Sequence, residues 1–376
     1  MKKIMFLSGK RGGFGAMTPL MQAVDRSDDL ELQLVLTDMH FLPKFGNTHH
    51  EVGDYFSCYT SLYPPTKNCN MDRLSDRTYA IGHYTQKMAS IICSREPDLL
   101  VLFGDRGESL AGATAAVQMN IPIAHIQGGD KTGTTDDVMR RMISQAASFH
   151  YVSNATAKTQ LCNMGINPFR VNVVGDLHLD AMLRPMDRPD YQMVMDDFFA
   201  LEAQSRHLIL VLMHPNMKEG QRSREFIRNI RKATSRTDCA VLYIYPCSDP
   251  GHSEIIDEIE RTKIGPRSIA ATTENVYQHD FYSLLYHARI IIGNSSCGII
   301  EAPYTGTWTL NLGHRQDGRL MDDSVVTISS ESVPLYNEVD KMLESSPPSC
   351  NRLYGEGKAT SEILYDFRWW LQDQAA

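Results

Sequence analysis

Short apolar segments of strand character alternate with helical stretches along most of this chain, and this alternation constrains its fold more than any other feature. In the first half, strands are predicted at 3–8, 32–36, 99–104, 121–126, 148–152 and 171–174, with helices such as 109–119 and 137–147 between them. Such alternation predicts a parallel, doubly wound sheet. In the helix at 137–147, Val138, Met142, Ala146 and Phe149 recur at helical spacing, which predicts a core-facing side.

A second strand–helix series follows a change in composition. Residues 184–190 form a polar linker with two prolines, and strands are predicted beyond it at 207–213, 240–245, 268–270, 288–292 and 308–312. A chain of 376 residues is too long for one ordinary domain. We therefore expect an N-terminal α/β domain over 1–182, a C-terminal one over 183–358 and a final helix over 359–376.

Bulk properties exclude several classes of protein. The net charge of −8 argues against a nucleic-acid-binding protein or one that binds a membrane surface. The eight cysteines show neither C-x-x-C spacing nor a disulfide framework, so we expect free thiols in a reducing cytoplasm and no structural zinc. The apolar segment 4–7 is too short for a signal peptide, and no apolar run approaches membrane-spanning length.

The segment 291–303 carries the strongest local signal for a ligand. An apolar strand ends in a Gly-Asn-Ser-Ser turn at 293–296, and a helix that carries Glu301 follows. The free N–H groups of a helix start, together with two hydroxyls, suit an anion such as a nucleotide diphosphate. Serine is also an ordinary helix N-cap, so a purely structural role stays open.

Polar side chains follow two apparently consecutive strands of the first half. Asp105 and Arg106 come directly after one strand, and Gln127 ends the next, with Asp130 close behind. In an open parallel sheet the carboxyl ends of the strands line the ligand crevice, so we expect these side chains and His125 on one rim. The alternative is that Asp105 only caps the helix after its strand.

Two further positions stand out by their spacing. Asp136 and Arg140 lie one helical turn apart, which a simple i,i+4 ion pair also explains. The glycines at 128, 129 and 133 favour a site, because they let the backbone approach a ligand closely. His214 is the first polar residue after the opening strand of the second half, although a lone histidine is more often structural.

Five segments occur in order along the chain: Gly104-Asp105-Arg106, His125-Ile126-Gln127-Gly128-Gly129-Asp130, Gly133-Thr134-Thr135-Asp136-Asp137-Val138-Met139-Arg140, the segment 291–303, and Asn311-Leu312-Gly313-His314-Arg315-Gln316-Asp317-Gly318-Arg319. Together they resemble the hydrolysing UDP-N-acetylglucosamine 2-epimerases of sialic-acid and related legionaminic-type nonulosonic-acid biosynthesis. The likeness runs from Met1 to about Arg319, which is most of the chain.

The resemblance implies a GT-B-like α/β fold, in which two doubly wound Rossmann-like domains face a central cleft. In that fold the last helix crosses back onto the first domain, and Trp369-Trp370-Leu371 suits such docking. The resemblance also implies a homodimer that acts on a nucleotide-sugar substrate. It calls for no metal and no cofactor.

In the family, the proton at C2 of the N-acetylhexosamine is removed while the nucleotide diphosphate leaves C1. Water then adds to the resulting glycal and gives the free manno 2-epimer. This chemistry needs acid/base groups near C1 and C2. It also needs positive charge or N–H dipoles at the departing diphosphate, where negative charge develops. The substrate implied is UDP-N-acetylglucosamine or a relative such as a nucleotide-linked 2,4-diacetamido-2,4,6-trideoxyglucose.

The resemblance assigns roles residue by residue. Asp105 and Asp136 match acid/base or sugar-orienting carboxylates, and His214 would face the phosphates or sugar. Arg106 and Arg140 belong to the carboxylate network. The remaining matches are Ser295, Ser296 and Gly298 for the diphosphate-binding turn, Glu301 for the ribose hydroxyls, Arg319 for the diphosphate, and Arg11 and Asp180 as further substrate-binding candidates.

The chain departs from the family pattern at three places, one of which is Ala16, where some relatives have a lysine. Many members have a glutamate where Gln127 stands, and an amide cannot act as a general base. Either Asp130 or Asp136 does that work, or Gln127 only binds the sugar, or the activity is altered. The first loop, 9–16, keeps Arg11 but has Gly13 in place of an acid, and its extra glycines would admit a larger sugar.

Three other functions stay open at this point. A non-hydrolysing 2-epimerase shares the fold and the elimination step, and a GT-B glycosyltransferase would need an acceptor and form no glycal. A sugar-nucleotide-binding regulator without catalysis is a third, which Gln127 and Gly13 favour. The sequence leaves open UDP against GDP and the substituents at C4 and C6.

Overall fold

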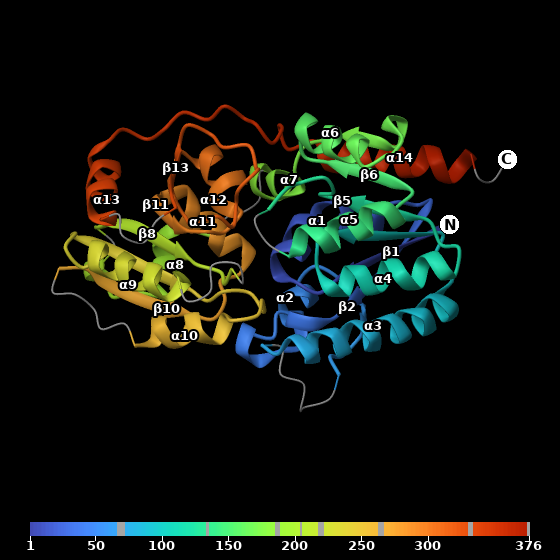
Figure 1. The fold of residues 1–376 in the computed structure, drawn as a ribbon, viewed down its shortest axis with the longest axis horizontal. Helices are drawn as coiled ribbons and strands as arrows, with labels where there is room; N and C mark the ends of the chain where they lie inside the picture. Colours follow the sequence, from blue (N-terminus) through green and yellow to red (C-terminus); the bar gives the residue numbers. More distant parts are fainter. Residues whose placement is uncertain are drawn as a thin grey trace. The chain divides into compact units, whose positions relative to one another are not determined.

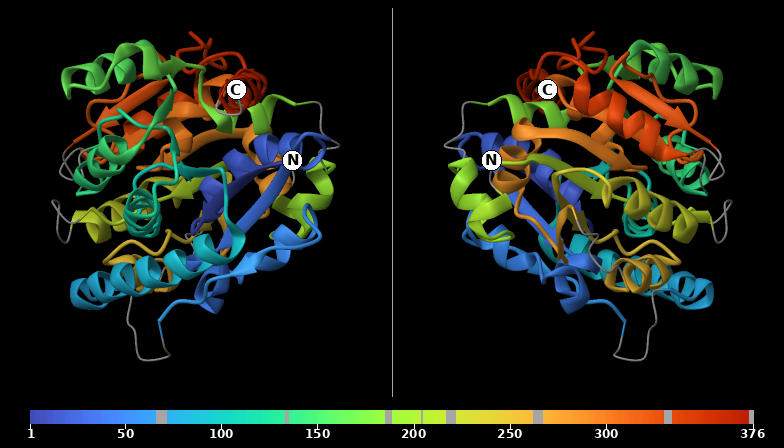
Figure 2. Two further views of the ribbon diagram at one scale, coloured as in Figure 1. Left: turned by 90° about the vertical axis from the view of Figure 1, so that its right-hand side faces the viewer. Right: turned by 90° about the vertical axis from the view of Figure 1, so that its left-hand side faces the viewer.

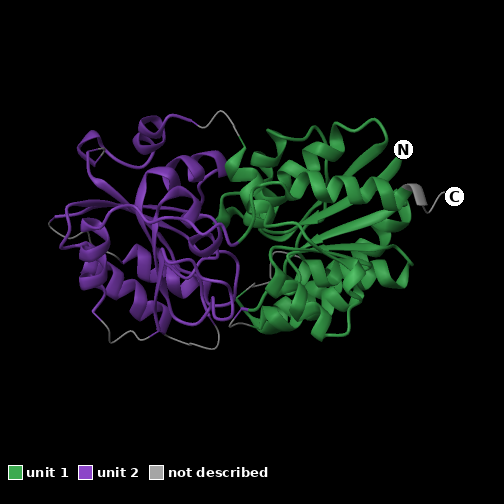
Figure 3. Cartoon of the chain, turned by 90° about the horizontal axis from the view of Figure 1, so that it is seen from above, with its two compact units in different colours: residues 1–131, 135–184, 354–376 green, residues 132–134, 185–353 purple. Residues whose placement is uncertain are grey.

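The computed structural model describes residues 1–65, 72–132, 135–184, 189–203, 205–216, 222–261, 267–329 and 334–373. The chain divides into two compact units, which Figure 3 shows in separate colours. Unit 1 comprises residues 1–131, 135–184 and 354–376, and unit 2 comprises 132–134 and 185–353. Each unit is built on its own parallel sheet, so the chain is an α/β protein, as its alternating pattern predicts.

Unit 1 holds a seven-stranded sheet in the order β3-β2-β1-β4-β5-β6-β7. The strand order reverses between β1 and β4, which makes their carboxyl ends the topological switch point, where open α/β sheets bind ligands. The strands are β1 (Lys2–Ser8), β2 (Leu30–Leu36), β3 (Thr60–Ser61), β4 (Leu99–Phe103), β5 (Ile123–Ile126), β6 (Phe149–Val152) and β7 (Val171–Val173).

Alternation along β1 divides the core of unit 1 between two faces of the sheet. Ile4 and Phe6 pack with α1, α7 and α14, whereas Met5 and Leu7 pack with α3 and α4. Figures 1 and 2 show α3 and α4 side by side. The helices are α1 (Arg11–Asp25), α2 (His49–Gly53), α3 (Leu74–Arg95), α4 (Gly107–Gln118), α5 (Asp136–Ala146), α6 (Ala155–Asn163), α7 (Leu177–Leu183) and α14 (Ala359–Asp373), with 3-10 turns η1 (Asp38–Phe41), η2 (Pro43–Phe45) and η3 (Pro168–Arg170).

Unit 2 holds a six-stranded sheet in the order β10-β9-β8-β11-β12-β13, again with every pair parallel. Its order reverses between β8 and β11, so their carboxyl ends form a second switch point. The strands are β8 (His207–Leu212), β9 (Cys239–Ile244), β10 (Ile269–Thr273), β11 (Ala288–Gly293), β12 (Trp308–Leu312) and β13 (Val325–Ile328).

The core of unit 2 lies mainly between its sheet and three helices. Phe226 and Ile230 of α9, Ile255 of α10 and Val339 of α13 pack with strand residues such as Val211, and all five are 0–1% exposed. The helices of this unit are α8 (Tyr191–Asp196), α9 (Arg222–Thr234), α10 (His252–Glu260), α11 (Gln278–His287), α12 (Cys297–Ile300) and α13 (Leu335–Glu344), with 3-10 turns η4 (Leu201–Ala203) and η5 (Ala302–Thr305).

The last helix, α14, packs on unit 1 through aromatic contacts. The ring of Phe367 meets Tyr151 edge-on at 5.7 Å, and Trp370 meets Phe149 at 4.8 Å. Trp369 is 60% exposed, so only one tryptophan of the pair takes part. Both contacts join the C-terminal helix to β6, far away in the sequence.

One predicted core face is only partly correct. Val138 and Met142 of α5 are 61% and 51% exposed, whereas Arg140, Ile143 and Ser144 are buried. The prediction is therefore wrong for Val138 and Met142, whereas Ala146 and Phe149 are partly buried and pack against the core. The strands β3 and β13 were also not predicted, since β3 has two residues and β13 follows a loop.

Two simple properties complete the fold. Among the described helices, none combines the length and apolar character that a membrane span needs. The cysteines in the described part of the chain are all free thiols: Cys58, Cys93, Cys162, Cys239, Cys247, Cys297 and Cys350.

Candidate active site

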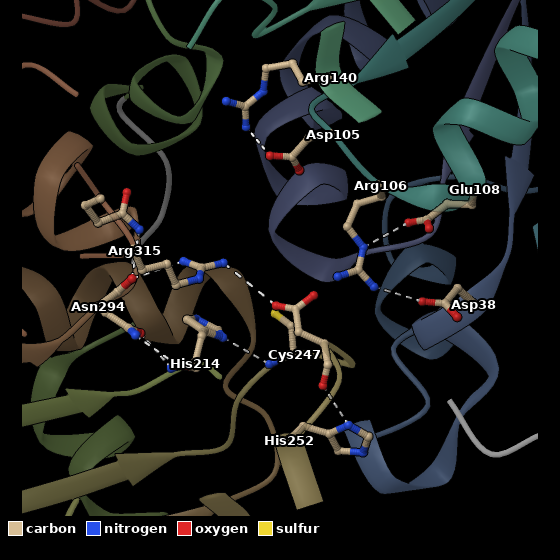
Figure 4. Close-up of polar contacts among 12 residues, drawn as sticks. Asp38, Asp105, Arg106, Glu108, Arg140, His214, Cys247, His252, Asn294 and Arg315 are labelled. Atoms are coloured by element: carbon tan, nitrogen blue, oxygen red, sulfur yellow. Dashed lines mark hydrogen bonds and ion pairs between the residues drawn. The ribbon is translucent and has the colours of Figure 1, made fainter. Parts of the chain in front are cut away.

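An ion pair between Asp105 and Arg140 lies at the carboxyl edge of the sheet of unit 1. Asp105 follows β4, and Arg140 reaches it from α5, as Figure 4 shows. The guanidinium also donates to the carbonyl oxygen of Asp130 at 2.7 Å and lies 4.0 Å from Asp137. Arg140 therefore pairs with Asp105, on the loop after β4. This contact differs from the i,i+4 pair with Asp136 that the sequence also allowed. The charge of Arg140 stabilises and orients the Asp105 carboxylate.

His125 supports the turn that carries Asp105. Its Nε2 donates to the carbonyl oxygen of Gly104 at 2.8 Å, and its Nδ1 accepts from the hydroxyl of Ser144 at 3.0 Å. The side chain is completely buried, and burial lowers its pKa to about 3 against the hydrogen bond to Gly104, which raises it. His125 is therefore a neutral structural support and does not exchange protons near neutral pH.

Gln127 directly follows β5 and lies beside Asp105, because β4 and β5 are neighbours with Phe103 opposite Ile126. Its backbone has a φ of 62°, a left-handed value that is uncommon for a residue with a side chain. Its Nε2 donates to the carboxylate of Asp176 at 2.9 Å, and Asp176 accepts from His178 Nδ1 at 2.6 Å. Neither Asp176 nor His178 was a candidate on the basis of the sequence.

Arg106 lies in a buried network with two acids. Its guanidinium is 3.3 Å from Asp38 and 3.5 Å from Glu108, and all three side chains are at most 6% exposed (Figure 4). Burial raises the pKa of Glu108, the charge of Arg106 lowers it and that of Asp38 raises it. Asp38 has a φ of 47°, so backbone strain accompanies this network. Sequence reasoning found Arg106 but missed both acids.

The other predicted residues of unit 1 lie near this edge. Asp136 is the first residue of α5 and is partly exposed. The carboxylate of Asp130 accepts from the hydroxyl of Ser153 at 3.2 Å. Gly133 lies outside the described residues, as do residues 185–188 of the predicted linker.

The segment 9–16 is not the open loop that we expected. α1 begins at Arg11, so Gly13 lies in its first turn. A Cβ on Gly13 would lie 3.3 Å from the ring of Phe103, and one on Gly9 would lie 2.5 Å from the carboxylate of Glu108. The protein's own side chains occupy the space beside these two glycines, whereas a Cβ on Gly12 would meet only Lys10 at 3.8 Å, so the larger sugar stays a prediction.

In unit 2, His214 and Asn294 join the carboxyl ends of β8 and β11. Asn294 Oδ1 accepts from the backbone N–H of His214 at 2.7 Å, and its Nδ2 donates to the His214 carbonyl at 2.9 Å. The Nδ1 of His214 accepts from the backbone N–H of Cys247 at 3.2 Å. A neutral His214 then carries its proton on Nε2, which suits donation to a phosphate or sugar oxygen.

Arg315 and Gln316 bind the same turn from the loop after β12. Both donate to the carbonyl oxygen of Asn294, at 3.0 and 2.8 Å, and Figure 4 shows Arg315 beside Asn294. Arg315 also lies 3.8 Å from Asp249. Arg315 thus sits at the switch point of unit 2 although it was not a predicted candidate. The signal for it was its place in the 311–319 segment.

The predicted diphosphate turn has a structure different from the expected one. The helix after it, α12, has only four residues, so it offers no extended helix dipole. Ser295 and Ser296 are partly exposed, and Glu301 is buried at its end. Gly298 serves packing, because a Cβ there would lie 2.8 Å from Thr309 Cγ2 on β12.

The remaining three predicted residues have surroundings of different kinds. Arg319 is partly buried, and its backbone N–H donates to the Gln316 carbonyl at 3.2 Å. Asp180 is 2% exposed, and its carboxylate accepts from the backbone N–H groups of Ala359 and Thr360 at 3.1 and 2.6 Å. Asp180 therefore caps the start of α14, and its role in substrate binding stays a prediction. Arg11, at the start of α1, is partly exposed.

No metal centre emerges from the described part of the chain. Within those ranges, no group of three or more histidine, cysteine or acidic side chains is arranged to hold a metal ion. The polar groups at the two switch points are instead carboxylates, amides, histidines and arginines.

Comparison with known proteins gives one family. The profile of the family described as UDP-N-acetylglucosamine 2-epimerase matches residues 22–366. The chain is 28% identical over 365 residues to a Legionella pneumophila protein named UDP-N,N'-diacetylbacillosamine 2-epimerase (hydrolyzing), covering 97% of this chain and 94% of that one. It is 29% identical over 341 residues to the Neisseria meningitidis UDP-N-acetylglucosamine 2-epimerase, covering 91% and 87%.

Solved structures agree on the fold. A crystal structure of UDP-GlcNAc 2-epimerase from Neisseria meningitidis bound to UDP-GlcNAc matches with a TM-score of 0.80 at 17% identity, covering 97% of this chain and 99% of that one. This likeness makes each unit part of a GT-B-like fold.

Proposed function

Since the chain belongs to the UDP-N-acetylglucosamine 2-epimerase family, we propose that it is a hydrolysing sugar-nucleotide 2-epimerase. Its substrate is UDP-N-acetylglucosamine or a related nucleotide-linked 2-acetamido sugar, such as 2,4-diacetamido-2,4,6-trideoxyglucose. Its products are the free manno 2-epimer and a nucleoside diphosphate. The similarity to a relative named as a hydrolyzing diacetylbacillosamine epimerase supports both the hydrolysis and the larger sugar.

The proposed reaction has two stages. A base takes the proton from C2, the C–H electron pair forms the C1–C2 double bond, and the diphosphate leaves with the C1–O pair. An acid/base group then activates water, which adds at C1, and C2 receives a proton on the opposite face. The first stage needs an ionised base near C2, and the second needs an acid near C2.

The observation that carries this proposal is the Asp105–Arg140 ion pair at the switch point of unit 1. The arginine stabilises the ionised form of Asp105, and the carboxylate stays 16% exposed, so it is accessible to a ligand. We assign proton transfer to Asp105 and Asp136, since Gln127 cannot accept a proton and Ser153 engages Asp130. Arg106 supports this edge through Asp38 and Glu108.

Unit 2 supplies the nucleotide-binding groups in this proposal. His214 donates from Nε2 to the diphosphate or the sugar, and the hydroxyls of Ser295 and Ser296 contact the phosphates. Glu301 accepts from the ribose hydroxyls, and Arg319 neutralises the diphosphate. The hydrogen bonds of Asn294 with His214 and with Arg315 support this role, because they hold the turn at 293–296 in a fixed position before the ligand binds.

Proton NMR in heavy water tests the proposal. The purified enzyme is given UDP-N-acetylglucosamine, then UDP- and GDP-linked 2,4-diacetamido-2,4,6-trideoxyglucose. We expect release of nucleoside diphosphate and a free manno sugar that carries deuterium at C2. A sugar that stays nucleotide-linked after exchange at C2 would instead identify a non-hydrolysing epimerase.

Matched variants locate the chemistry. Asp105→Asn should lower the exchange rate at C2 by about 100-fold or more, the usual contribution of a general acid or base. Asp98→Asn is the control, because Asp98 precedes the same strand β4 at its amino end and pairs with Lys2. Equal losses in the two variants, or normal exchange in Asp105→Asn, would refute the assignment.

A further inference from the structure

Asp176 is a buried carboxylate that binds two side chains at once. One oxygen accepts from the Nε2 of Gln127 at 2.9 Å, and the other accepts from His178 Nδ1 at 2.6 Å and from the His178 backbone N–H at 3.0 Å. The Asp176 backbone N–H donates to the Tyr354 carbonyl at 2.8 Å. The carboxylate therefore has a fixed position between β5, α7 and the segment at 354.

The carboxylate is ionised at neutral pH. Burial alone would raise the pKa of Asp176, but the charge and hydrogen bonds of His178 and the hydrogen bond from Gln127 lower it to about 2. An ionised carboxylate only accepts hydrogen bonds. The amide of Gln127 must therefore turn its NH₂ group toward Asp176, which determines where its carbonyl oxygen points.

The carbonyl oxygen of Gln127 lies over the turn that carries Asp105. A Cβ placed on Gly104 would be 3.9 Å from this oxygen. Throughout the described ranges, no group donates a hydrogen bond to it, and the Gln127 residue is 7% exposed. The oxygen itself is not fully buried, so a substrate group bound at Asp105 would replace water as its donor.

We propose that Asp176 and His178 are positioning residues, which hold the Gln127 amide so that its carbonyl oxygen accepts a hydrogen bond from the acetamido N–H of the sugar. This inference rests on the proposed function, because it concerns the sugar bound beside Asp105. Gln127 is then a specificity residue for an N–H donor and takes no part in proton transfer, because it is an amide. A carboxylate at position 127 would face the Asp176 carboxylate at the same distance and be repelled.

The test exchanges the donor and acceptor roles of Gln127 and Asp176. In Gln127→Glu two carboxylates meet, so we expect kcat/KM to fall by about 100-fold while the inhibition constant of UDP stays within about twofold. In the double variant Gln127→Glu/Asp176→Asn, the amide introduced at position 176 donates to the carboxylate introduced at position 127 and still accepts from His178. An oxygen again faces the substrate, and we expect at least a tenfold recovery.

Gln127→Met removes both hydrogen-bonding groups at similar size and covers the case in which the charged variant does not fold. We expect it to raise KM for the sugar nucleotide about tenfold and to leave the UDP constant unchanged, whereas Gln145→Met, at an exposed position on α5, changes neither. Thermal unfolding verifies that each variant is folded. A double variant no better than Gln127→Glu, or a Gln127→Met enzyme with normal KM, would overturn the inference.

The outcome is separable from that of the proposed function. If the wild-type enzyme releases no nucleoside diphosphate, the affinity for intact UDP-N-acetylglucosamine and for UDP is measured directly by calorimetry. The inference then predicts that Gln127→Met removes the part of the affinity that the sugar adds and spares the part due to UDP. An unchanged ratio of the two dissociation constants would reject it on that protein as well.

Discussion

His125 Nε2 donates a hydrogen bond of 2.8 Å to the carbonyl oxygen of Gly104, the residue before Asp105. This bond joins the end of β5 to the turn after β4, where Gly104 has a φ of 73°. Because a carbonyl oxygen only accepts, the proton must lie on Nε2, and Ser144 then donates to Nδ1. A neutral, completely buried histidine thus sets the direction of the Asp105 carboxylate.

A pair of His→Leu variants tests this support. His125 and His150 lie opposite each other on β5 and β6, and both are at most 1% exposed. His125→Leu leaves the Gly104 carbonyl without its donor, which costs about 1–3 kcal/mol, and we expect kcat to fall about tenfold or more. His150 makes no hydrogen bond from either ring nitrogen to a described residue, so His150→Leu should keep kcat and raise the melting temperature. Equal losses of kcat would contradict the argument.

Arg140→Lys tests the ion pair with Asp105. Lysine keeps the charge but cannot donate to Asp105 and to the Asp130 carbonyl in the same fork geometry. Loss of one charged hydrogen bond costs about 1.5–3 kcal/mol, so we expect kcat/KM to fall about 10- to 100-fold. Arg141→Lys, at the next and exposed position of α5, is the control and should leave kinetics unchanged. A similar result for both variants would show that the pair does not matter.

The buried network of Arg106 should respond very unequally to its two neutralising variants. Arg106→Gln removes the guanidinium that pairs with the buried Asp38 and Glu108, and removing one partner of a buried pair costs about 3–5 kcal/mol. Glu108→Gln should cost far less, because burial already raises the pKa of Glu108 and favours its neutral form. Urea unfolding at neutral pH measures both free energies. A larger loss for Glu108→Gln would mean that Arg106 is not the essential charge.

The alternating pattern was sufficient to predict the parallel sheets and the residues at their carboxyl ends. Asp105, Gln127 and His214 each follow a strand that the sequence marks clearly, and the neighbouring positions of β4 and β5 confirm the expectation for the first two. Backbone direction is a local property, so it can be predicted from local sequence.

Contacts between distant segments could not be predicted in this way. Asp176 and Gln127 are 49 residues apart, and Arg106 and Asp38 are 68 apart, so no spacing rule joins them. The same limit explains the error at Val138 in α5. Arg140 is buried in its ion pair with Asp105, 35 residues earlier, and Val138 lies on the exposed side of the helix. The hydrogen bonds of Asp180 to Ala359 and Thr360 join segments equally far apart, so they could not be predicted either.

Three buried histidines should make the protein lose stability in mild acid. Burial lowers the pKa of His40 and His125 to about 3 and that of His150 to about 4, from an ordinary 6.5. Below pH 6.5 the unfolded chain therefore binds more protons than the folded one. Stability present above 6.5 is lost as the pH falls toward the folded values, with a slope approaching about 1.4 kcal/mol per pH unit for each histidine.

Urea unfolding between pH 7 and pH 5 measures this slope. Asp176, whose pKa is lowered to about 2, titrates below this window and does not contribute. His150→Leu should reduce the slope by one histidine's share, without the loss of activity expected of His125→Leu. A slope that is the same in His150→Leu and in the wild type would contradict the assignment of His150 as a neutral buried group.

Asn294→Asp tests the organisation of unit 2. One side-chain oxygen can still accept from the His214 N–H, but the other replaces the Nδ2 donor and faces the His214 carbonyl at 2.9 Å. Two acceptors then meet at a position that is 0% exposed, which costs about 1–3 kcal/mol or more. The turn that positions His214 and accepts from Arg315 should loosen, and we expect the dissociation constant of UDP to rise about tenfold.

Calorimetric titration with UDP measures this change, and thermal unfolding shows whether the variant is folded. A folded variant with unchanged UDP affinity would show that this turn does not bind the nucleotide, whereas a loss of UDP affinity in a folded variant with the Asp105–Arg140 pair intact would place nucleotide binding in unit 2.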